Sequence, residues 1–283
     1  MRWTLATLLG SALVAHQALA DLSFTVEATR KGVRIPQSEI KLVPFEFGRS
    51  RIGHGHGTPP PGPPGRSSSK MRRANPSATS ANWCGSVNTT PSNNPIKVVH
   101  GAFQHPTCSP RAGVTTFPQA AANWVGIDGD SWTSALLQSG TVCKISSNGA
   151  IVHEVWWQWV PSAAFTISSM PVQPDDWFDI TINTTSTTAA QVTIINLSQG
   201  HSYTLSITNG PTLARVNADW VVERPYYGSG LVSFPSFTDV WFDEAWATRT
   251  TGSLGILGAK QFQIPGLCAS QEWDDTHEVS WSL

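Results

Sequence analysis

The stretch "AQVTIINLSQGHSYTLSIT", residues 190–208, contains two runs in which apolar and polar side chains alternate. The short break Ser198-Gln199-Gly200 separates the two runs. Alternation with a period of two is typical of strands that bury one face, and a short break that contains glycine joins such strands. Residues 190–208 are therefore predicted to form an antiparallel β-hairpin.

The same alternation recurs on both sides of the hairpin, while signals for helices are nearly absent. In residues 175–187, the side chains of Phe178, Ile180 and Ile182 share one face of a predicted strand. Further strands are predicted in "RVNADWVVERP" (215–225), "FTDVWFDEAWAT" (237–248) and "HEVSWSL" (277–283). Many strands divided by Gly, Pro, Ser and Asn turns favour an all-β antiparallel sandwich or barrel.

Three tryptophans crowd one predicted strand near the middle of the chain. Parity places Trp157 and Trp159 on one face of this strand, and Trp156 with Gln158 on the other. One of these faces can belong to the core, and the other is then free to line a groove. A sandwich whose core is rich in tryptophan is an equal alternative for each tryptophan taken alone.

Residues 1–20, MRWTLATLLGSALVAHQALA, have the features of a secretory signal peptide. Arg2 gives a positive start, an apolar stretch follows, and Ala18-Leu19-Ala20 fits the rule for cleavage after small residues. The remainder has no uninterrupted apolar run approaching the ~18 residues of a membrane span. We therefore predict a secreted, extracellular protein with no membrane segment.

Residues 21–73 differ in charge from the rest of the chain. They hold ten Lys and Arg against four Asp and Glu, include a Gly/Pro-rich low-complexity stretch, and end in the dibasic pair Arg72-Arg73. Residues 74–283 hold seven basic and fifteen acidic residues, a net charge of −8. We predict a basic, partly disordered propeptide that docks on the acidic domain as an intramolecular inhibitor and detaches when acid protonates the carboxylates. A disordered linker with a chance charge bias is the alternative.

The acidic domain of residues 74–283 argues against nucleic acid as a partner, because phosphate binding needs a basic surface. Its four cysteines suggest up to two disulfides, and the sequence leaves all three pairings open: Cys84, Cys108, Cys143 and Cys268. These cysteines lack the spacing of a zinc site, so no metal or cofactor is predicted. Possible glycosylation sites begin at Asn88, Asn183 and Asn196. We expect a monomer.

Common catalytic motifs are missing from the chain. It has no Gly-x-Ser-x-Gly elbow, no His-Glu-x-x-His helix, and no Asp-Thr-Gly or Asp-Ser-Gly. A carboxyl group such as Glu223 can exchange a proton with water, and an amide such as Gln138 can donate to an oxyanion. From spacing alone, a structural glutamate near a strand end remains the default interpretation of Glu223.

Seven motifs follow one another through the domain of residues 74–283. They are "ANWCGSV" (81–87), "GAFQHP" (101–106), "NWVGIDGDSWTSALLQSG" (123–140), "VWWQWVP" (155–161), "INLSQGHSYT" (195–204), "NADWVVERP" (217–225) and "FTDVWF" (237–242). In this order they resemble the glutamic peptidases of fungi, also called eqolisins or peptidase family G1. The resemblance implies a sandwich of two curved antiparallel sheets, a concanavalin A-like jelly roll, with the active site in a groove.

The resemblance also assigns roles to residues. It implies that Gln138 and Glu223 are catalytic, with the Glu as general base and acid on a water and the Gln stabilising the oxyanion. Substrate-binding positions fall on Trp124, Asp128, Trp156 and Gln158. The chain departs from the family pattern at Gln158, where a glutamate is frequent, at Val160 in place of tyrosine, and at Asp219 in place of glutamate. The last change favours Glu223 as the essential acid.

The function that the resemblance implies is a secreted acid endopeptidase, metal-independent and insensitive to pepstatin, that acts on polypeptides. A carbohydrate-active or lectin-like sandwich is the alternative, because exposed tryptophans stack on sugars and pairs of carboxylates cleave glycosides. No well-placed second carboxylate accompanies Glu223 in the sequence, which weakens the glycosidase version of this alternative.

Overall fold

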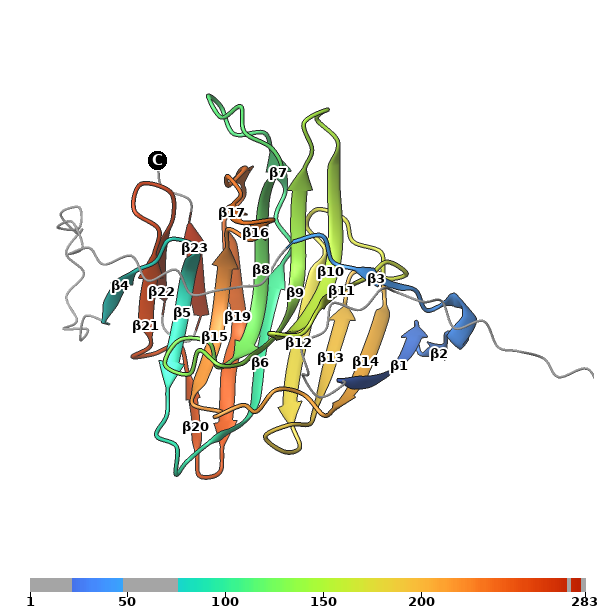
Figure 1. Cartoon of the computed structure of the whole chain (residues 1–283), viewed down its shortest axis with the longest axis vertical. Coiled ribbons are helices and arrows are strands. Elements are labelled where there is room, and N and C mark those ends of the chain that lie inside the picture. The colour runs from blue at the N-terminus through green and yellow to red at the C-terminus, as the bar shows by residue number, and fades with distance from the viewer. Residues whose placement is uncertain (1–21, 48–75, 274–275, 281–283) are drawn as a thin grey trace, which may run out of the picture.

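The computed structural model describes residues 22–47, 76–273 and 276–280. In this part of the chain the structure is nearly all β, and the short 3-10 helix η1 (Gln37–Glu39) is its one helical element. The strands form a ten-stranded and a nine-stranded sheet that pack face to face (Figure 1). The predicted all-β antiparallel sandwich is confirmed.

The ten-stranded sheet is antiparallel throughout. Its order is β2 (Val33–Arg34), β1 (Ser23–Arg30), β14 (His201–Thr208), β13 (Ala190–Asn196), β12 (Trp177–Thr184), β6 (Ile96–Gln104), β19 (Val240–Arg249), β23 (Thr276–Ser280) and β22 (Ala269–Trp273), with β20 (Ser253–Gly255) on β19. The predicted hairpin is β13 and β14, with Asn196 opposite His201. Its turn ends at Gly200, whose φ of 69° is one that glycine adopts without strain.

The nine-stranded sheet carries most of the motifs singled out in the sequence. Its order is β3 (Leu42–Pro44), β11 (Ala164–Ile167), β10 (Ile151–Val160), β9 (Leu136–Ile145), β8 (Gln119–Ile127), β15 (Asn217–Glu223), β5 (Trp83–Thr89), β21 (Lys260–Gln263) and β4 (Ser77–Thr79). The β4–β21 pair is parallel and the other pairs are antiparallel. Two small ribbons, β16 (Tyr226–Tyr227) with β17 (Gly230–Leu231) and β7 (Cys108–Ser109) with β18 (Ser236–Phe237), stand apart from both sheets.

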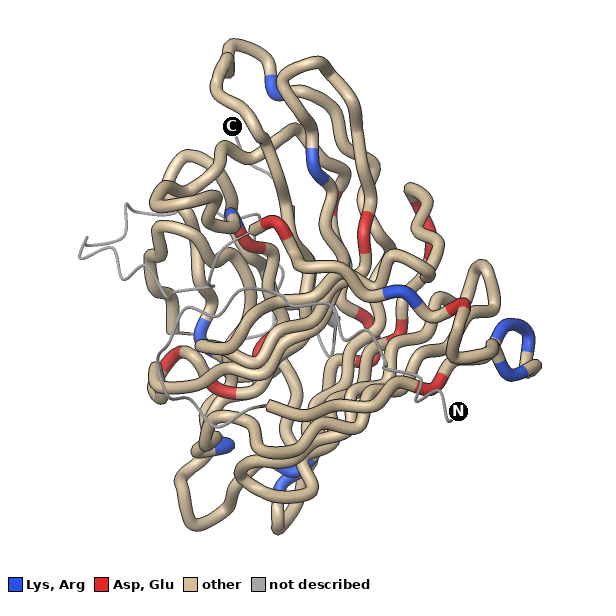
Figure 2. Tube along the Cα trace, turned by 45° about the vertical axis from the view of Figure 1, so that its right-hand side comes forward, with Lys and Arg blue, Asp and Glu red and all other residues tan. Residues whose placement is uncertain are grey.

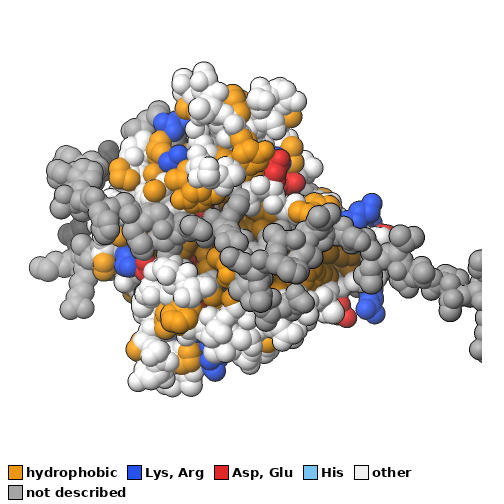
Figure 3. Space-filling model, viewed as in Figure 1, with side chains coloured by type: hydrophobic (Ala, Val, Ile, Leu, Met, Phe, Trp, Pro, Cys, Tyr) orange, Lys and Arg blue, Asp and Glu red, His pale blue; other side chains and the backbone are white. Residues whose placement is uncertain are grey.

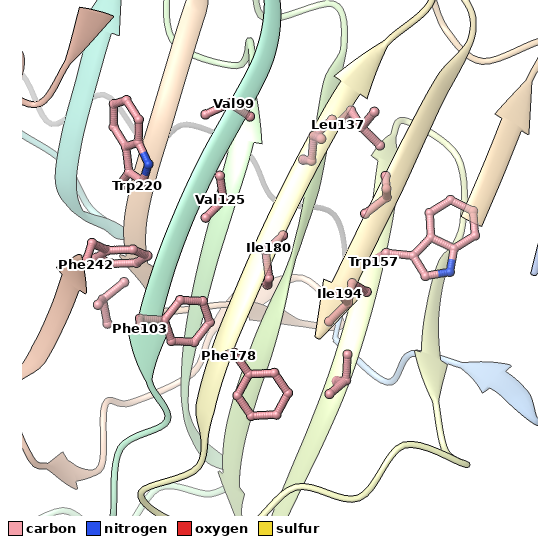
Figure 4. Close-up of a cluster of buried hydrophobic side chains, with 14 of the residues drawn as sticks. Val99, Phe103, Val125, Leu137, Trp157, Phe178, Ile180, Ile194, Trp220 and Phe242 are labelled. Carbon is pink, nitrogen blue, oxygen red and sulfur yellow. The ribbon is translucent and has the colours of Figure 1, made fainter. Parts of the chain in front are cut away.

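The main core lies between the two sheets (Figure 4). Phe178 and Ile180 of β12 belong to this core together with Trp157 of β10 and Trp220 of β15, and all four side chains are buried. The predicted parity of β12 is therefore confirmed. The Trp220 indole also donates to the His100 carbonyl at 2.8 Å, so this large side chain is buried with its polar atom satisfied.

The segment Leu22–Phe47, called here the leader, is part of the sandwich. Strand β1 extends the ten-stranded sheet beside β14, and β3 extends the nine-stranded sheet beside β11. Strand pairing satisfies backbone groups and buries apolar side chains such as Val26 and Ala28 at 4% and 2% exposure, and neither effect needs a charge difference. Residues 1–21 and 48–73 of the predicted signal peptide and propeptide lie outside the described residues.

One ion pair joins the described leader to the domain. The ion pair between leader and domain among these residues joins the acidic Glu46 of the leader to the basic Lys144 of β9. Its polarity is opposite to that of a basic segment on an acidic surface. Figure 2 shows charged residues thinly spread over the strands, as the 13% of charged residues in the chain requires.

Both possible disulfides form, and the structure selects one of the three pairings. Cys84 on β5 bonds Cys268, and Cys108 on β7 bonds Cys143 on β9. Of the glycosylation sequons, Asn183 is exposed, whereas Asn196 is fully buried and donates from Nδ2 to the Pro171 carbonyl and to Asp176. Asn196 is therefore not an accessible acceptor for a glycan.

Loop length predicts which disulfide contributes more to stability. The two bonds join cysteines 184 and 35 positions apart, so loop-closure entropy gives about 5 kcal/mol for Cys84–Cys268 and about 4 kcal/mol for Cys108–Cys143. We expect the double variant that replaces Cys84 and Cys268 by alanine to lose more free energy of unfolding, measured by urea titration, than the double variant that replaces Cys108 and Cys143. Equal losses would contradict the chain-entropy account.

Candidate active site

The candidate site lies on the face of the nine-stranded sheet that points away from the main core. Trp157 and Trp159 belong to the main core, whereas Trp156, on the opposite face of β10, belongs to a second apolar cluster. That cluster includes the fully buried Trp83 of β5 and Trp124 of β8. On the surface, hydrophobic side chains gather across the middle of the view in Figure 3. The parity predicted for the three tryptophans is confirmed.

A small pocket on this face brings together several of the predicted site residues. It is lined by Phe45, Ala122, Gln138, Trp156, Gln158, Glu223 and Pro225. Gln138 comes from β9, Trp156 and Gln158 from β10, and Glu223 from the end of β15. Segments that are far apart in the sequence therefore place one carboxyl group and two amides around the same space.

Two nitrogen donors fix the carboxyl group of Glu223, which is only 2% exposed. Asn82 Nδ2 donates to Oε1 at 3.0 Å, and Trp124 Nε1 donates to Oε2 at 2.9 Å. Hydrogen bonds from these N–H groups stabilise the ionised carboxylate and orient it. No role for Asn82 follows from the sequence alone, although Asn82 lies in the motif "ANWCGSV" (81–87).

The side chain of Gln138 is oriented by a second chain of hydrogen bonds. Its Nε2 donates to Gln158 Oε1 at 3.3 Å, and Gln158 Nε2 in turn donates to the Ser162 carbonyl at 3.0 Å. Gln138 Oε1 is buried and accepts no hydrogen bond within the described part of the molecule. The amide therefore presents a buried acceptor beside the pocket, and Gln158, where the family often has glutamate, positions it.

Register shows how Gln138 and Glu223 come to share the pocket. Gln138 is opposite Gly126 on β8 and Glu223 is opposite Ala122, so the two residues lie on the two sides of β8 and four residues apart along it, and their side chains line the same pocket. Trp124 lies between these two levels and reaches Glu223 with its indole nitrogen. A Cβ atom at Gly126 would lie 2.7 Å from the Trp124 ring, so glycine at this position leaves room for the indole.

Asp128 does not line this pocket. Its backbone has a φ of 70°, and its carboxylate accepts from the backbone N–H groups of Arg215, Val216 and Asn217 at 2.8, 2.7 and 3.3 Å. Burial raises the pKa of this carboxyl group, and the backbone donors act against that rise. The contacts show Asp128 fixing the chain that enters β15, the strand that ends in Glu223.

Asp219 lies on the same face of β15 as Glu223 but outside the pocket. Its side chain is fully buried, and neither carboxyl oxygen has a hydrogen-bond partner in the described residues. Burial, and then the charges of Asp128 and Asp130, raise the pKa of Asp219 well above its usual value. The group is therefore protonated in acid and remains so at higher pH than an ordinary aspartate.

Among the described residues, no group of three or more His, Cys, Asp or Glu side chains is placed to hold a metal ion. No helix in the described part of the chain is long and apolar enough to cross a membrane.

Comparison with known proteins identifies the family. The model of the peptidase A4 family matches residues 81–280, more than two thirds of the chain. The chain belongs to the peptidase A4 family. This match covers the pocket residues contributed by the domain and excludes Phe45 of the leader.

Individual relatives support this assignment. Aspergillopepsin-2 of Aspergillus niger is 33% identical over 146 residues, which are 51% of this chain and 51% of the relative. Scytalidopepsin B of Scytalidium lignicola is 30% identical over 106 residues, 37% of this chain and 39% of the relative. The chain thus spans about half or less of the length of these curated relatives. A solved structure of scytalido-glutamic peptidase with a transition state analog inhibitor has the same fold, with a TM-score of 0.63 at 24% identity over 71% of this chain and 98% of that one.

Replacing Trp124 by phenylalanine tests the contact with Glu223. Trp124→Phe keeps an aromatic ring but removes the Nε1 donor. The loss of this hydrogen bond destabilises the ionised carboxylate of Glu223 by about 1.5–3 kcal/mol. We expect kcat/KM for peptide hydrolysis to fall about 10- to 100-fold, and its acid limb to move to higher pH. Trp83→Phe, in the same apolar cluster, is the matched control. An unchanged pH profile in Trp124→Phe would contradict the assigned contact.

The raised pKa of Asp219 predicts that the contribution of this residue to stability falls between acid and neutral pH. Because the pKa of Asp219 is raised in the folded chain, the folded chain keeps a proton at this residue. The unfolded chain releases that proton above the ordinary pKa of an aspartate, about 4. The stabilisation is complete below that value and is lost as pH rises toward the folded pKa. Each pKa unit by which the folded value exceeds the unfolded value changes the free energy of unfolding by about 1.4 kcal/mol, or the Tm by about 3 °C.

Asp219→Asn should therefore melt at a higher temperature than its parent at pH 7, and the difference should shrink toward pH 3. Parallel stability curves from pH 3 to pH 7 would rule out a raised pKa at Asp219.

Proposed function

We propose that this member of the peptidase A4 family is a secreted, acid-acting endopeptidase that hydrolyses polypeptides with Glu223 and Gln138 as its catalytic pair. The observation that carries the proposal is the shared pocket, in which a carboxyl group held by two N–H donors meets an oriented amide. Membership of the family supports peptide-bond hydrolysis as the reaction.

The proposed reaction begins with a water molecule bound between Glu223 and the scissile carbonyl. The Glu223 carboxylate takes a proton from this water, and the water oxygen attacks the carbonyl carbon. The carbonyl oxygen becomes an oxyanion, to which Gln138 Nε2 donates the hydrogen that it does not donate to Gln158. Glu223 then returns the proton to the leaving nitrogen, the C–N bond breaks, and the carboxylate is regenerated.

This pair suits acid conditions for two reasons. Asn82 and Trp124 favour the ionised form of Glu223, which the general base must have when the reaction begins. The amide of Gln138 does not titrate, so it keeps its donor at every working pH. Neither step uses a metal ion or a pair of aspartates, and we therefore propose that catalysis is independent of metal and insensitive to pepstatin.

We further propose that the protein is made as a zymogen, with the propeptide as an intramolecular inhibitor. Phe45 lines the same pocket as Gln138 and Glu223, and Glu46 beside it bonds Lys144 of β9. A substrate cannot occupy the volume that the leader fills. Removal of this segment is then the step that opens the site.

Two substitutions test the catalytic pair. Glu223→Gln removes the general base but keeps the size of the side chain, and we expect kcat to fall by at least about a thousandfold. Gln138→Ala removes an oxyanion donor, for which a loss of about 10²–10³-fold in kcat is expected. Hydrolysis of denatured protein at pH 3, with and without pepstatin, is the measurement.

Glu244→Gln and Gln191→Ala are the matched controls, because both side chains are exposed on the ten-stranded sheet. They should retain full activity. Full proteolysis by either Glu223→Gln or Gln138→Ala would refute the pair. Cleavage of polysaccharides in place of protein, abolished by Glu223→Gln, would favour the carbohydrate-active alternative.

A further inference from the structure

Phe45 of the leader contacts Trp156, and this contact has no part in the proposed reaction of Glu223 and Gln138. The Phe45 ring stacks on the indole of Trp156 with the ring centroids 5.0 Å apart and an angle of 3° between the planes. Both rings line the pocket that holds Gln138 and Glu223. An aromatic side chain therefore lies flat against one wall of the candidate active site.

Strand pairing delivers Phe45 to this place. In β3, Pro44 is opposite Phe165 of β11, and the next residue, Phe45, donates its backbone N–H to the Ala164 carbonyl at 2.9 Å. The leader thus runs along the edge of the nine-stranded sheet as an added strand until its side chain enters the pocket. Polypeptides in general bind sheet edges in this way, with backbone bonds giving attachment and side-chain pockets giving selectivity.

A separate set of contacts attaches the leader at a distance from the pocket. All eight residues of β1 are paired with β14, from Ser23 opposite Thr208 to Arg30 opposite His201. Phe24 of β1 packs edge-on against Trp157 in the main core, at 4.9 Å between ring centroids. Attachment and pocket filling therefore rest on different residues and can be separated by mutation.

The contacts that follow Phe45 hold its neighbours over the same face. Phe47 is 2% exposed and lies edge-on to Phe45, with ring centroids 5.4 Å apart. Glu46, between them, forms the ion pair with Lys144, whose ammonium is also 5.9 Å from the centre of the Phe47 ring. The leader segment is thus fixed on both sides of the side chain that enters the pocket.

We propose that the pocket beside Trp156 is an aromatic subsite for polypeptide substrates, and that Phe45 of the leader occupies it as a built-in substrate mimic. This inference rests on the proposed peptidase function and deepens it, because it names the side-chain class that the site accepts. The Trp156 indole gives a flat apolar wall, on which a planar side chain gains stacking energy beyond what its buried area provides. An alanine side chain has no such contact.

The experiment measures binding without catalysis, in full-length protein that carries Glu223→Gln. The probes are two blocked tetrapeptides, acetyl-Ala-Phe-Ala-Ala-amide and its all-alanine counterpart, titrated by calorimetry. We expect Phe45→Ala to bind the phenylalanine probe at least 10-fold more tightly than the parent, and the all-alanine probe less than 3-fold more tightly. Phe45→Trp, which refills the subsite, should show no gain.

Val43→Ala is the matched control, since Val43 lies on the same added strand with its side chain 42% exposed. It should bind both probes as the parent does. Phe45→Leu, which keeps an apolar side chain in the cluster, provides a second variant if Phe45→Ala does not fold, and should give a smaller gain for the phenylalanine probe only. Equal gains for both probes, an equal gain in Val43→Ala, or no gain in a folded Phe45→Leu variant would overturn the subsite.

Because no hydrolysis is measured, the result does not depend on whether Glu223 is the general base. If Phe45→Ala showed no selectivity between the two probes, the aromatic subsite would be refuted, but the assignment of Glu223 and Gln138 as the catalytic pair would still stand. Full proteolysis by the Glu223→Gln variant would refute the pair and leave the binding result standing.

Discussion

Alternate side chains of a β-strand point to opposite faces of a sheet, and both faces of the nine-stranded sheet in this protein are buried. One face forms the main core with the ten-stranded sheet, and it takes Trp157 from β10 and Trp220 from β15. The neighbouring residues Trp156 and Asp219 are then forced to the opposite face. A shift of one residue in register would exchange the two sets, so the packing of the core also fixes which polar groups reach the candidate site.

The candidate site is assembled from side chains that lie at different levels of neighbouring strands. Gln138 and Glu223 come from strands separated by β8, and Trp124 of β8 connects their levels through its bond to the Glu223 carboxylate. Gly126 leaves space for that indole. Asp128 acts further away, by holding the backbone that enters β15. Small and distant residues thus position the carboxyl group as much as the residues that touch it.

The leader pairs with strands of both sheets and also reaches the candidate site, where Phe45 lines the pocket. Strands β1 and β2 of the leader extend the ten-stranded sheet, and β3 extends the nine-stranded sheet, through backbone bonds that depend little on side-chain identity. Backbone pairing of this kind leaves no mark in composition, so composition and charge alone do not predict it. The Glu46–Lys144 pair, with the acid on the leader, shows that local contacts can run against the net charge of the two segments.

Much of the fold was predictable from the sequence, because alternation is a local property. The β13–β14 hairpin, the inward face of Phe178 and Ile180, and the two faces of the tryptophan-rich strand follow from periodicity alone. The family resemblance added Gln138 and Glu223 as candidates, and the motifs that carry it lie within the region matched by the peptidase A4 family.

Only the tertiary structure decided how these pieces meet. It selected the disulfide pairing, moved Asp128 to a supporting place outside the pocket, added Asn82 to the carboxyl group, and put Phe45 of the leader beside Trp156. Each of these contacts joins segments that are distant in the chain. Periodicity determines which way a side chain points along its own strand, whereas the order and register of the strands determine what it touches.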